Sequence, residues 1–387
     1  LPLTGKPRVA IVGPTADDPL ALLSGYSFPV HLIISDMVDN TAQVTTPLTA
    51  LRSYLGEENI RYAKGCHIIK ERLAGAPVFP GDSSGKPMQS SPVSLDISLI
   101  DDAVNAARES EVVIACVGDL AGLFQSGTVG EGSDTDSLNL PGVQQQLLEA
   151  LVATGKPVIV VMTGGRPYNL QGLESKVAAF MLAWAPGQEG GWAIADVLTG
   201  RAEPQGRLVV SVPKSAGAMP FYYNHKLKSG GTPFAFHFGA LYPFGYGLGW
   251  TTFDYGTPTL LSENVDIHGD VTLSVTVKNS GERSGSEVVQ VYVRDNIASM
   301  VRPLQELKAF QRVALAPGES ATLTFMIPVD MLNFTSHQGQ RIVEPGEFEF
   351  QIGRSSADIR GRVTVTVTGE TRVLPENWRM MSWCDVK

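Results

Sequence analysis

The sequence predicts an α/β three-layer sandwich with a mostly parallel sheet over residues 1–215, followed by an all-β sandwich over residues 251–370. Two observations predict this class. In the first part, short and wholly apolar runs alternate with stretches of helical spacing, which is typical of parallel strands buried on both faces. In the second part, apolar residues recur at every second position between turn sequences, which indicates short antiparallel strands.

The length and the charge of the chain limit what it can be. The 387 residues are too many for one ordinary domain. The net charge of −9 argues against binding to nucleic acid, which needs a basic face. No apolar run reaches the length of a membrane-spanning helix, so we expect no membrane partner. No signal peptide precedes the first strand, and the abrupt start at Leu1 suggests a cut or processed boundary.

Three isolated cysteines, Cys66, Cys116 and Cys384, give no framework for disulfides or zinc, because none belongs to a CxxC pair. Cys116 lies inside an apolar run and is expected to be a small buried side chain. The six histidines are scattered along the sequence and suggest no metal site. We therefore expect neither a metal nor another cofactor.

In the first part, the order of elements follows from the spacing of apolar residues. The expected strands cover residues 8–13, 112–117, 157–162 and 177–183. The expected helices cover residues 46–55, 96–109, 142–154 and 190–198. Asp96 is predicted to be the N-cap of the second of these helices, with Ile97 on its apolar face.

The rest of the chain divides into three segments. Residues 216–250 are rich in aromatic residues and glycine, and so many aromatic side chains would not be left in water by a flexible linker. We expect an ordered connector there. Residues 251–370 form the predicted β-sandwich, and the tail, 371–387, is expected to lie back over another surface. Alternating strands are predicted at 272–278, 289–293, 322–327, 347–352 and 363–367.

A long loop between residues 118 and 142 is the segment most suggestive of chemistry. It begins at the carboxyl end of a predicted parallel strand, where open α/β sheets place their sites, and it is longer than most loops in compact domains. Within it, glycines flank Glu131, so little shields this carboxylate, which a mobile loop could offer to a groove. On residue type alone, Glu131, Asp134 and Asp136 are better explained as solvated loop acids, because most surface acids have no function.

An ordered series of motifs resembles the second and third domains of glycoside hydrolase family 3. The resemblance extends from Leu1 to Arg354 and implies a flavodoxin-like first domain and a fibronectin-III-like second one. In the first, the matching segments are Leu1–Leu3, Val9–Pro14, Gly65–Cys66, Val117–Asp119, Glu131–Asp134, Leu138–Gln144, Gly164–Pro167, Trp184–Gly191, Pro204–Leu208 and Tyr242–Leu248. In the second, they are Asn279–Gly281, Glu287–Tyr292 and Leu304–Phe310.

The resemblance implies a retaining exo-acting β-glycosidase in which Glu131 is the general acid/base. It also implies that the nucleophile, an aspartate, lies on an N-terminal TIM-barrel-like domain or chain that this sequence lacks. Asp36, in the sequence Ser35–Met37, is interpreted as structural. The family often carries arginine after the aspartate of the loop, whereas this chain has Thr135, so the loop lacks one expected brace.

Other residues of the loop and its surroundings have two possible roles. Asp119 is expected either to bind sugar hydroxyls or to hold the loop, and Phe124 either to stack on a sugar or to anchor the loop. Trp184 and Trp192 are interpreted as packing residues. Two arginines, Arg166 and Arg207, are expected to form salt bridges.

Several alternatives remain open at this point. The substrate implied is a β-linked oligosaccharide or glycoside, cleaved by a β-glucosidase or exo-β-glucanase, with a β-xylosidase as the alternative. A non-catalytic carbohydrate-binding module would fit the same two folds. Nucleotide binding is disfavoured because Gly13-Pro14 ends the first strand where a Gly-x-Gly-x-x-Gly turn would be required. A homodimer and a periplasmic or secreted location are further expectations, with the cytoplasm as the other possible location.

Overall fold

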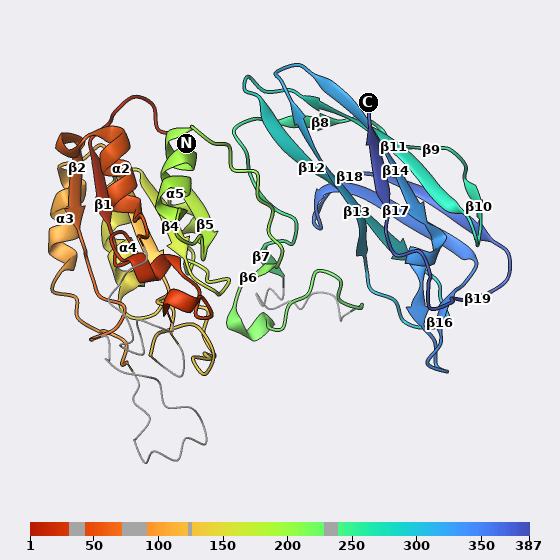
Figure 1. The fold of residues 1–387 in the computed structure, drawn as a ribbon, viewed down its shortest axis with the longest axis horizontal. Coiled ribbons are helices and arrows are strands. Elements are labelled where there is room, and N and C mark those ends of the chain that lie inside the picture. The colour runs from red at the N-terminus through yellow and green to blue at the C-terminus, as the bar shows by residue number, and fades with distance from the viewer. Residues whose placement is uncertain (31–42, 72–90, 123–125, 228–238) are drawn as a thin grey trace, which may run out of the picture. The chain divides into compact units, whose positions relative to one another are not determined.

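The computed structural model describes residues 1–30, 43–71, 91–122, 126–227 and 239–387. The chain folds into two compact units, Leu1–Ala202 and Glu203–Lys387, and each is described by itself (Figure 1). The division therefore lies at residue 202, before the boundary at 215 expected from the sequence. Within the described ranges, no helix has the length and apolar character needed to cross a membrane.

The first unit is built on a parallel sheet of five strands in the order β2-β1-β3-β4-β5, which confirms the predicted class. The strands are β1 (Val9–Val12), β2 (Ile60–Ala63), β3 (Val112–Gly118), β4 (Val158–Thr163) and β5 (Ala179–Trp184). The α-helices are α2 (Pro47–Leu55), α3 (Ile100–Arg108), α4 (Gln144–Ala153) and α5 (Gly190–Thr199). Short 3-10 helices are η1 (Pro19–Leu22), η2 (Glu57–Asn59) and η3 (Leu173–Ser175).

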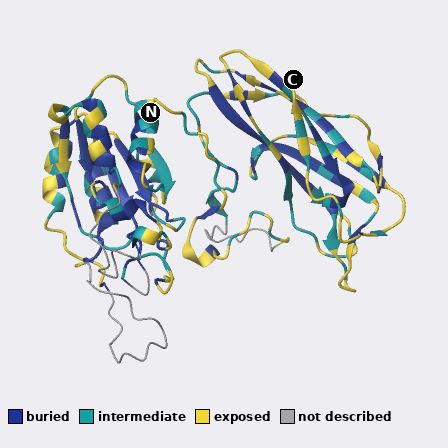
Figure 2. Cartoon of the chain, in the orientation of Figure 1, coloured by how far each residue is buried: buried dark blue, intermediate teal, exposed yellow. Residues whose placement is uncertain are grey.

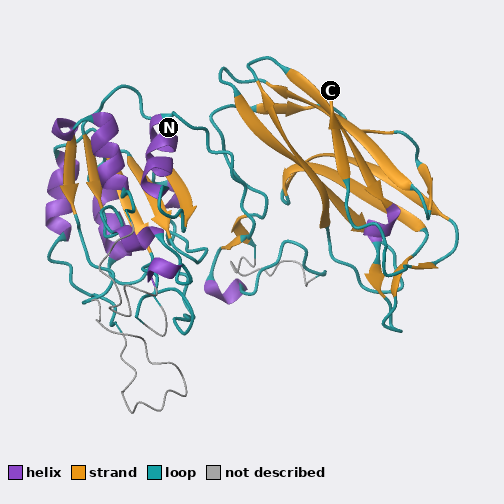
Figure 3. Cartoon of the chain, viewed as in Figure 1, coloured by secondary structure: helices purple, strands orange, loops and turns teal. Residues whose placement is uncertain are grey.

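Helices cover both faces of this sheet (Figure 3). Helices α3 and α4 bury Ala103 and Leu147 against one face, together with Val113 of β3. Helices α2 and α5 pack with Ile114, also of β3, on the opposite face. Every residue of β3 and β4 is buried, which explains why both sequences are apolar apart from Thr163 at the end of β4 (Figure 2).

Two details of the first unit differ from the sequence-based expectation. Helix α3 begins at Ile100 with Leu99 as its N-cap, so the prediction of a cap at Asp96 was wrong. The Asp96 carboxylate instead accepts a hydrogen bond from the Ser98 amide at 2.9 Å, in a turn that precedes the helix. Ile97 therefore lies outside the helix and is 58% exposed.

Cysteines in the first unit behave as apolar side chains. Cys66 and Cys116 are buried and free, and burial raises the pKa of each thiol to about 12. The prediction of a buried Cys116 is thus confirmed. Among the described residues, no cluster of histidine, cysteine and carboxylate side chains could hold a metal ion.

The second unit is a β-sandwich whose main sheets have the strand orders β10-β18-β17-β12-β13 and β20-β14-β11-β8, with β9 paired to β11. The longer strands are β11 (Asp270–Asn279), β12 (Gly285–Asp295), β13 (Glu306–Leu315), β14 (Ser320–Pro328), β17 (Gly346–Ser355) and β18 (Asp358–Thr368). The shorter strands are β8 (Phe253–Tyr255), β9 (Thr259–Leu260), β10 (Asn264–Asp266), β15 (Phe334–Thr335), β16 (Arg341–Val343), β19 (Arg372–Val373) and β20 (Trp383–Val386), and the 3-10 helix η5 spans Val329–Leu332.

Inward-facing residues of both sheets form one core, as strict alternation along β11 predicts. Two further features complete the unit. The tail forms β20, which pairs antiparallel with β14 at the edge of a sheet. The completely buried Glu287 of β12 accepts hydrogen bonds at 2.9 Å from both Arg207 and Arg354, so the prediction of a salt bridge for Arg207 is confirmed.

The described part of the aromatic connector packs within the second unit. Strand β6 (Val212–Pro213) pairs with β7 (Ala240–Tyr242), and the 3-10 helix η4 spans Ala216–Ala218. The Tyr223 ring stacks on Phe244 with 4.2 Å between ring centroids, and its hydroxyl accepts a hydrogen bond from the Leu307 amide at 3.0 Å. Tyr223 and Phe244 thus pack against the sandwich, whereas Tyr222 of the same segment is exposed.

The end of strand β3 provides a test of this fold. Gly118 has φ +143°, and a Cβ atom there would lie 1.7 Å from the Thr163 carbonyl oxygen on β4. We expect Gly118→Ala to lower the free energy of unfolding by about 3 kcal/mol or more, because neighbouring backbones must separate. Gly155→Ala is the control, since Gly155 also has positive φ (+74°) but no atom lies within 4 Å of its Cβ position.

Gly155→Ala should cost only about 1–2 kcal/mol, the strain of a left-handed backbone. Urea unfolding of both variants followed by circular dichroism measures the difference. Equal losses in the two variants would contradict the packing argument at Gly118.

Candidate active site

The sheet order places a topological switch point between the carboxyl ends of β1 and β3. From β1 the chain moves outward to β2, and from there it crosses to β3 on the other side of β1. The loops that leave β1 and β3 therefore flank one crevice at this edge, which is where open α/β sheets bind ligands. Glu131 lies in the β3–α4 loop, and Tyr26 lies in the β1–α2 loop.

Glycines allow the β3–α4 loop to pair with itself. The Gly122 amide donates to the Val129 carbonyl at 2.9 Å, and the Thr128 amide donates to the Leu120 carbonyl at 2.8 Å. Gly130 has φ +124°, and a Cβ atom there would lie 1.8 Å from the Gly122 carbonyl oxygen. The glycine beside Glu131 is therefore required by close backbone approach, and not only because it leaves the carboxylate uncovered.

The carboxylate of Asp119, only 1% exposed, lies beneath this loop. It accepts hydrogen bonds from the Tyr168 hydroxyl at 2.7 Å, the Thr128 hydroxyl at 2.9 Å and the Gly165 amide at 3.4 Å. Burial raises the pKa of the Asp119 carboxyl, although these bonds and the charge of Arg166 act in the opposite direction. Asp119 thus connects the loop to the segment that follows β4.

Arg166 connects the loop to the same segment by a second set of contacts. Its guanidinium donates to the Thr128 carbonyl at 2.5 Å and also to the Ser133 carbonyl, and lies 3.8 Å from the Asp119 carboxylate. The predicted salt bridge of Arg166 is therefore confirmed. Because Thr128 and Ser133 stand on either side of Glu131, Arg166 supplies a brace that Thr135 cannot provide.

Glu131 itself is exposed and has one described side-chain partner. The Tyr26 hydroxyl donates to Glu131 Oε2 at 2.9 Å, and this bond to a carboxylate raises the pKa of the Tyr26 hydroxyl. The carboxylate is thus held at the edge of the crevice without being covered. Asp134 and Asp136 are also exposed loop residues.

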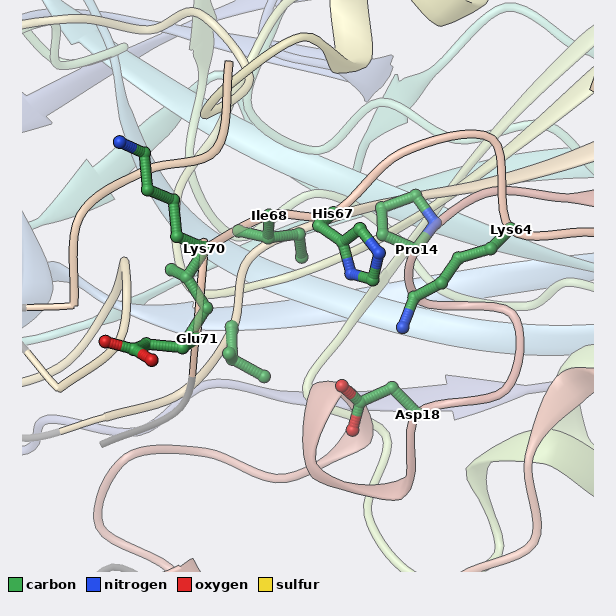
Figure 4. A pocket seen from close by; sticks show the side chains of 9 residues that line it. Pro14, Asp18, Lys64, His67, Ile68, Lys70 and Glu71 are labelled. Atoms are coloured by element: carbon green, nitrogen blue, oxygen red, sulfur yellow. The ribbon is translucent and has the colours of Figure 1, made fainter. Parts of the chain in front are cut away.

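A pocket of about 250 Å³ lies at the same edge of the sheet (Figure 4). Pro14 and Leu120 contribute to its lining from the ends of β1 and β3, and Figure 4 shows Lys64 and His67 on a wall that faces Asp18. Its volume is below the roughly 300–1,000 Å³ of most small-molecule sites. Among the described residues of this unit, the pocket is therefore small for holding a whole sugar chain.

The remaining sequence predictions have different outcomes. Phe124 and Asp36 lie outside the described residues, so their roles stay predictions. The Trp192 ring packs against the Tyr54 ring, with 5.2 Å between their centroids, which confirms Trp192 as a packing residue. Trp184 has φ +53° at the end of β5, where the register of the strand shifts.

Sequence reasoning missed Tyr26 and Thr128, the residues that contact Glu131 and Asp119. Neither belongs to a periodic pattern, because both lie in loops. A weak signal was available in the pair Gly25-Tyr26, where a glycine precedes an aromatic residue after a buried strand.

Comparison with known proteins agrees with this architecture. The model of the glycosyl hydrolase family 3 C-terminal domain matches residues 1–250, and that of a fibronectin type III-like domain matches residues 287–356. A periplasmic β-glucosidase of Salmonella typhimurium is 36% identical over 93% of this chain, and a β-xylosidase of Formosa agariphila is 36% identical over 93%. Each match covers 46% of the relative, so the chain spans about half the length of these curated relatives.

Solved structures give the same result. A β-glucosidase from intestinal bacteria, described as involved in saponin metabolism, matches with a TM-score of 0.84 and 34% identity over 95% of this chain and 52% of its own. A β-glucosidase from Listeria innocua in complex with glucose matches with a TM-score of 0.79 and 29% identity, over 97% of this chain and 47% of its own. By its sequence and its fold, this chain belongs to glycosyl hydrolase family 3.

Proposed function

We propose that this chain is part of a retaining exo-acting β-glycosidase and supplies its general acid/base, Glu131. The observation that supports the proposal most directly is the placement of Glu131. Its carboxylate is exposed at the switch point of the sheet, while the loop that carries it is fastened below by Asp119 and Arg166. A solvated loop acid with no function would not need such fastening.

Retaining hydrolysis requires two carboxyl groups about 5 Å apart. In the first step, the nucleophile attacks the anomeric carbon while the proton of Glu131 moves to the leaving oxygen, and the glycosidic bond breaks. In the second step, Glu131 takes a proton from water as the water oxygen displaces the nucleophile from the sugar. Glu131 thus ends each cycle protonated, as it began.

The nucleophile is proposed to lie on an N-terminal barrel domain or chain. The relatives that match this chain are about twice as long, which leaves room for such a domain. The small size of the described pocket in the first unit also supports a sugar site built mainly elsewhere. A periplasmic or secreted location is proposed from the name of the Salmonella relative.

The preferred substrates are β-glucosides, with β-xylosides as the second candidate. The β-glucosidase and β-xylosidase relatives are equally similar to this chain, so identity does not separate the two. The names of these relatives favour an enzyme over a non-catalytic carbohydrate-binding module. A homodimer stays a prediction.

Asp119 is proposed to hold the loop rather than to bind sugar. Its side chain is 1% exposed, and both of its oxygens already accept hydrogen bonds from the protein. A sugar hydroxyl would have to displace one of these donors. Phe124 keeps both of its proposed roles, stacking on a sugar or anchoring the loop.

The role of Glu131 is tested by Glu131→Ala in the chain assembled with its barrel domain. We expect turnover of alkyl β-glycosides to fall about 10²–10⁴-fold, because their leaving groups need a proton. An activated dinitrophenyl glycoside should lose much less in the bond-breaking step, and azide should restore turnover by forming a glycosyl azide. Asp134→Ala, at another exposed acid of the loop, is the control.

Equal, small effects of Glu131→Ala and Asp134→Ala on both substrates would contradict the assignment. A binding module would show no kinetic effect in either variant, and only a change in sugar affinity measured by calorimetry.

The division of the active site is tested with the chain alone. Because the nucleophile is proposed to be elsewhere, the purified 387-residue chain should release no nitrophenol from nitrophenyl β-glucoside or β-xyloside. Adding the separately produced barrel domain should restore release, faster from the glucoside. Robust turnover by the chain alone would refute the division, and a faster xyloside reaction would favour the second candidate.

The role of Asp119 is tested by Asp119→Ala, which leaves Arg166 and Tyr168 without their buried partner. We expect a loss of about 3 kcal/mol in the free energy of unfolding, typical of breaking a buried charge pair. Asp136→Ala, at an exposed position of the same loop, should change stability by less than about 0.5 kcal/mol. Urea titration of both variants measures this, and an unchanged stability with a raised KM would instead indicate a sugar-binding Asp119.

A further inference from the structure

The contact between Tyr26 and Glu131 joins residues that are 105 positions apart in the sequence. The Tyr26 hydroxyl can reach Glu131 only because the β1–α2 and β3–α4 loops meet. The Tyr26 side chain is 68% exposed, so it contributes little to the core. Its hydroxyl donates a hydrogen bond to Glu131 Oε2 at 2.9 Å, which suggests a role beyond stability.

The backbone one residue before each partner fixes this contact. A Cβ atom on Gly25 would lie 3.2 Å from both the Gly130 Cα atom and the Gly122 carbonyl oxygen. The two loops therefore touch through glycines, and Tyr26 and Glu131 directly follow the touching residues. Gly130 also packs against Gly122, so the backbones at Gly25, Gly122 and Gly130 are in close contact with one another.

We propose that Tyr26 is a positioning residue for the general acid/base, which orients the Glu131 carboxyl group through Oε2 and leaves Oε1 to exchange the proton. This inference rests on the proposed function of Glu131. Tyr26 need not touch the sugar, because it acts through the carboxyl group.

The chemistry of the two half-reactions explains what this bond would do. In the first step, the O–H bond at Oε1 breaks as its proton moves to the leaving oxygen, and the resulting carboxylate keeps the Tyr26 hydrogen bond at Oε2. A donor to a carboxylate stabilises its charged form. In the second step, water returns a proton to Oε1, and the same bond keeps the carboxyl group in place.

The test is Tyr26→Phe in the chain assembled with its barrel domain. We expect kcat for an alkyl β-glycoside to fall about tenfold, the effect of one hydrogen bond to a charged group, with KM nearly unchanged. For a dinitrophenyl glycoside, kcat/KM, which reports the bond-breaking step, should change less than about twofold, because departure of this group needs little protonation.

Tyr222→Phe is the matched control, since Tyr222 is 61% exposed and belongs to the second unit. It should leave turnover of both substrates unchanged. Thermal unfolding of Tyr26→Phe should match that of the parent chain. In a Glu131→Ala background, Tyr26→Phe should have no further kinetic effect, because the group it orients is gone.

Gly25→Ala is a second variant that keeps the tyrosine but moves its loop. Its Cβ would be too close to Gly130, so the Tyr26 hydroxyl would shift by a few tenths of an ångström. We expect a smaller loss with the same dependence on leaving group.

The outcomes separate this inference from the proposed function. Equal losses on both substrates would overturn positioning, and so would no loss at all. If Glu131→Ala behaves as an acid/base variant while Tyr26→Phe is silent, only the inference about Tyr26 fails. If Glu131→Ala retains full turnover without azide rescue, the proposed function itself fails.

Discussion

The candidate site depends on one buried anion. Burying a carboxylate costs free energy unless hydrogen-bond donors replace the water around it. The Asp119 carboxylate accepts hydrogen bonds from the Tyr168 and Thr128 hydroxyls and lies beside the Arg166 guanidinium. Arg166 in turn binds backbone carbonyls on both sides of Glu131, including that of Ser133. The buried Asp119 carboxylate and Arg166 together therefore fix the backbone of the loop that carries the exposed Glu131.

Glycine has a specific part in this arrangement. A loop rich in glycine suggests mobility from sequence alone, but the glycines at 122 and 130 let two stretches of backbone approach more closely than any side chain would permit. Gly25 extends the same contact to the loop after β1. The acid is thus held by backbone contacts and one phenol, while its own side chain stays open to solvent.

Sequence patterns predicted the class of the fold because burial constrains whole runs of residues. Strands β3 and β4 are apolar apart from Thr163, since helices cover both of their faces. Strand β2 lies at an edge of the sheet and is only partly buried, so its sequence shows no such run. The cap at Asp96 was predicted wrongly because a turn and a helix start use the same short-range hydrogen bonds.

The site could be predicted only in part. Glu131 was proposed from the sequence because a family resemblance and a long loop after a strand point to the same position. Its partner Tyr26 was not, since the contact depends on how two distant loops meet in space. Thr128 and Arg166 are connected to Asp119 by geometry that no spacing along the chain reveals.

Strand β5 ends the parallel sheet, and its consequences reach beyond catalysis. Its six residues, Ala179–Trp184, carry no charge, and all of them are only partly covered. An edge strand without charged side chains favours strand addition by neighbouring molecules, because no charge opposes the approach of a second strand. Of the two edge strands of this sheet, β2 carries Arg61 and β5 carries no charge, so β5 is where we expect self-association during purification or storage.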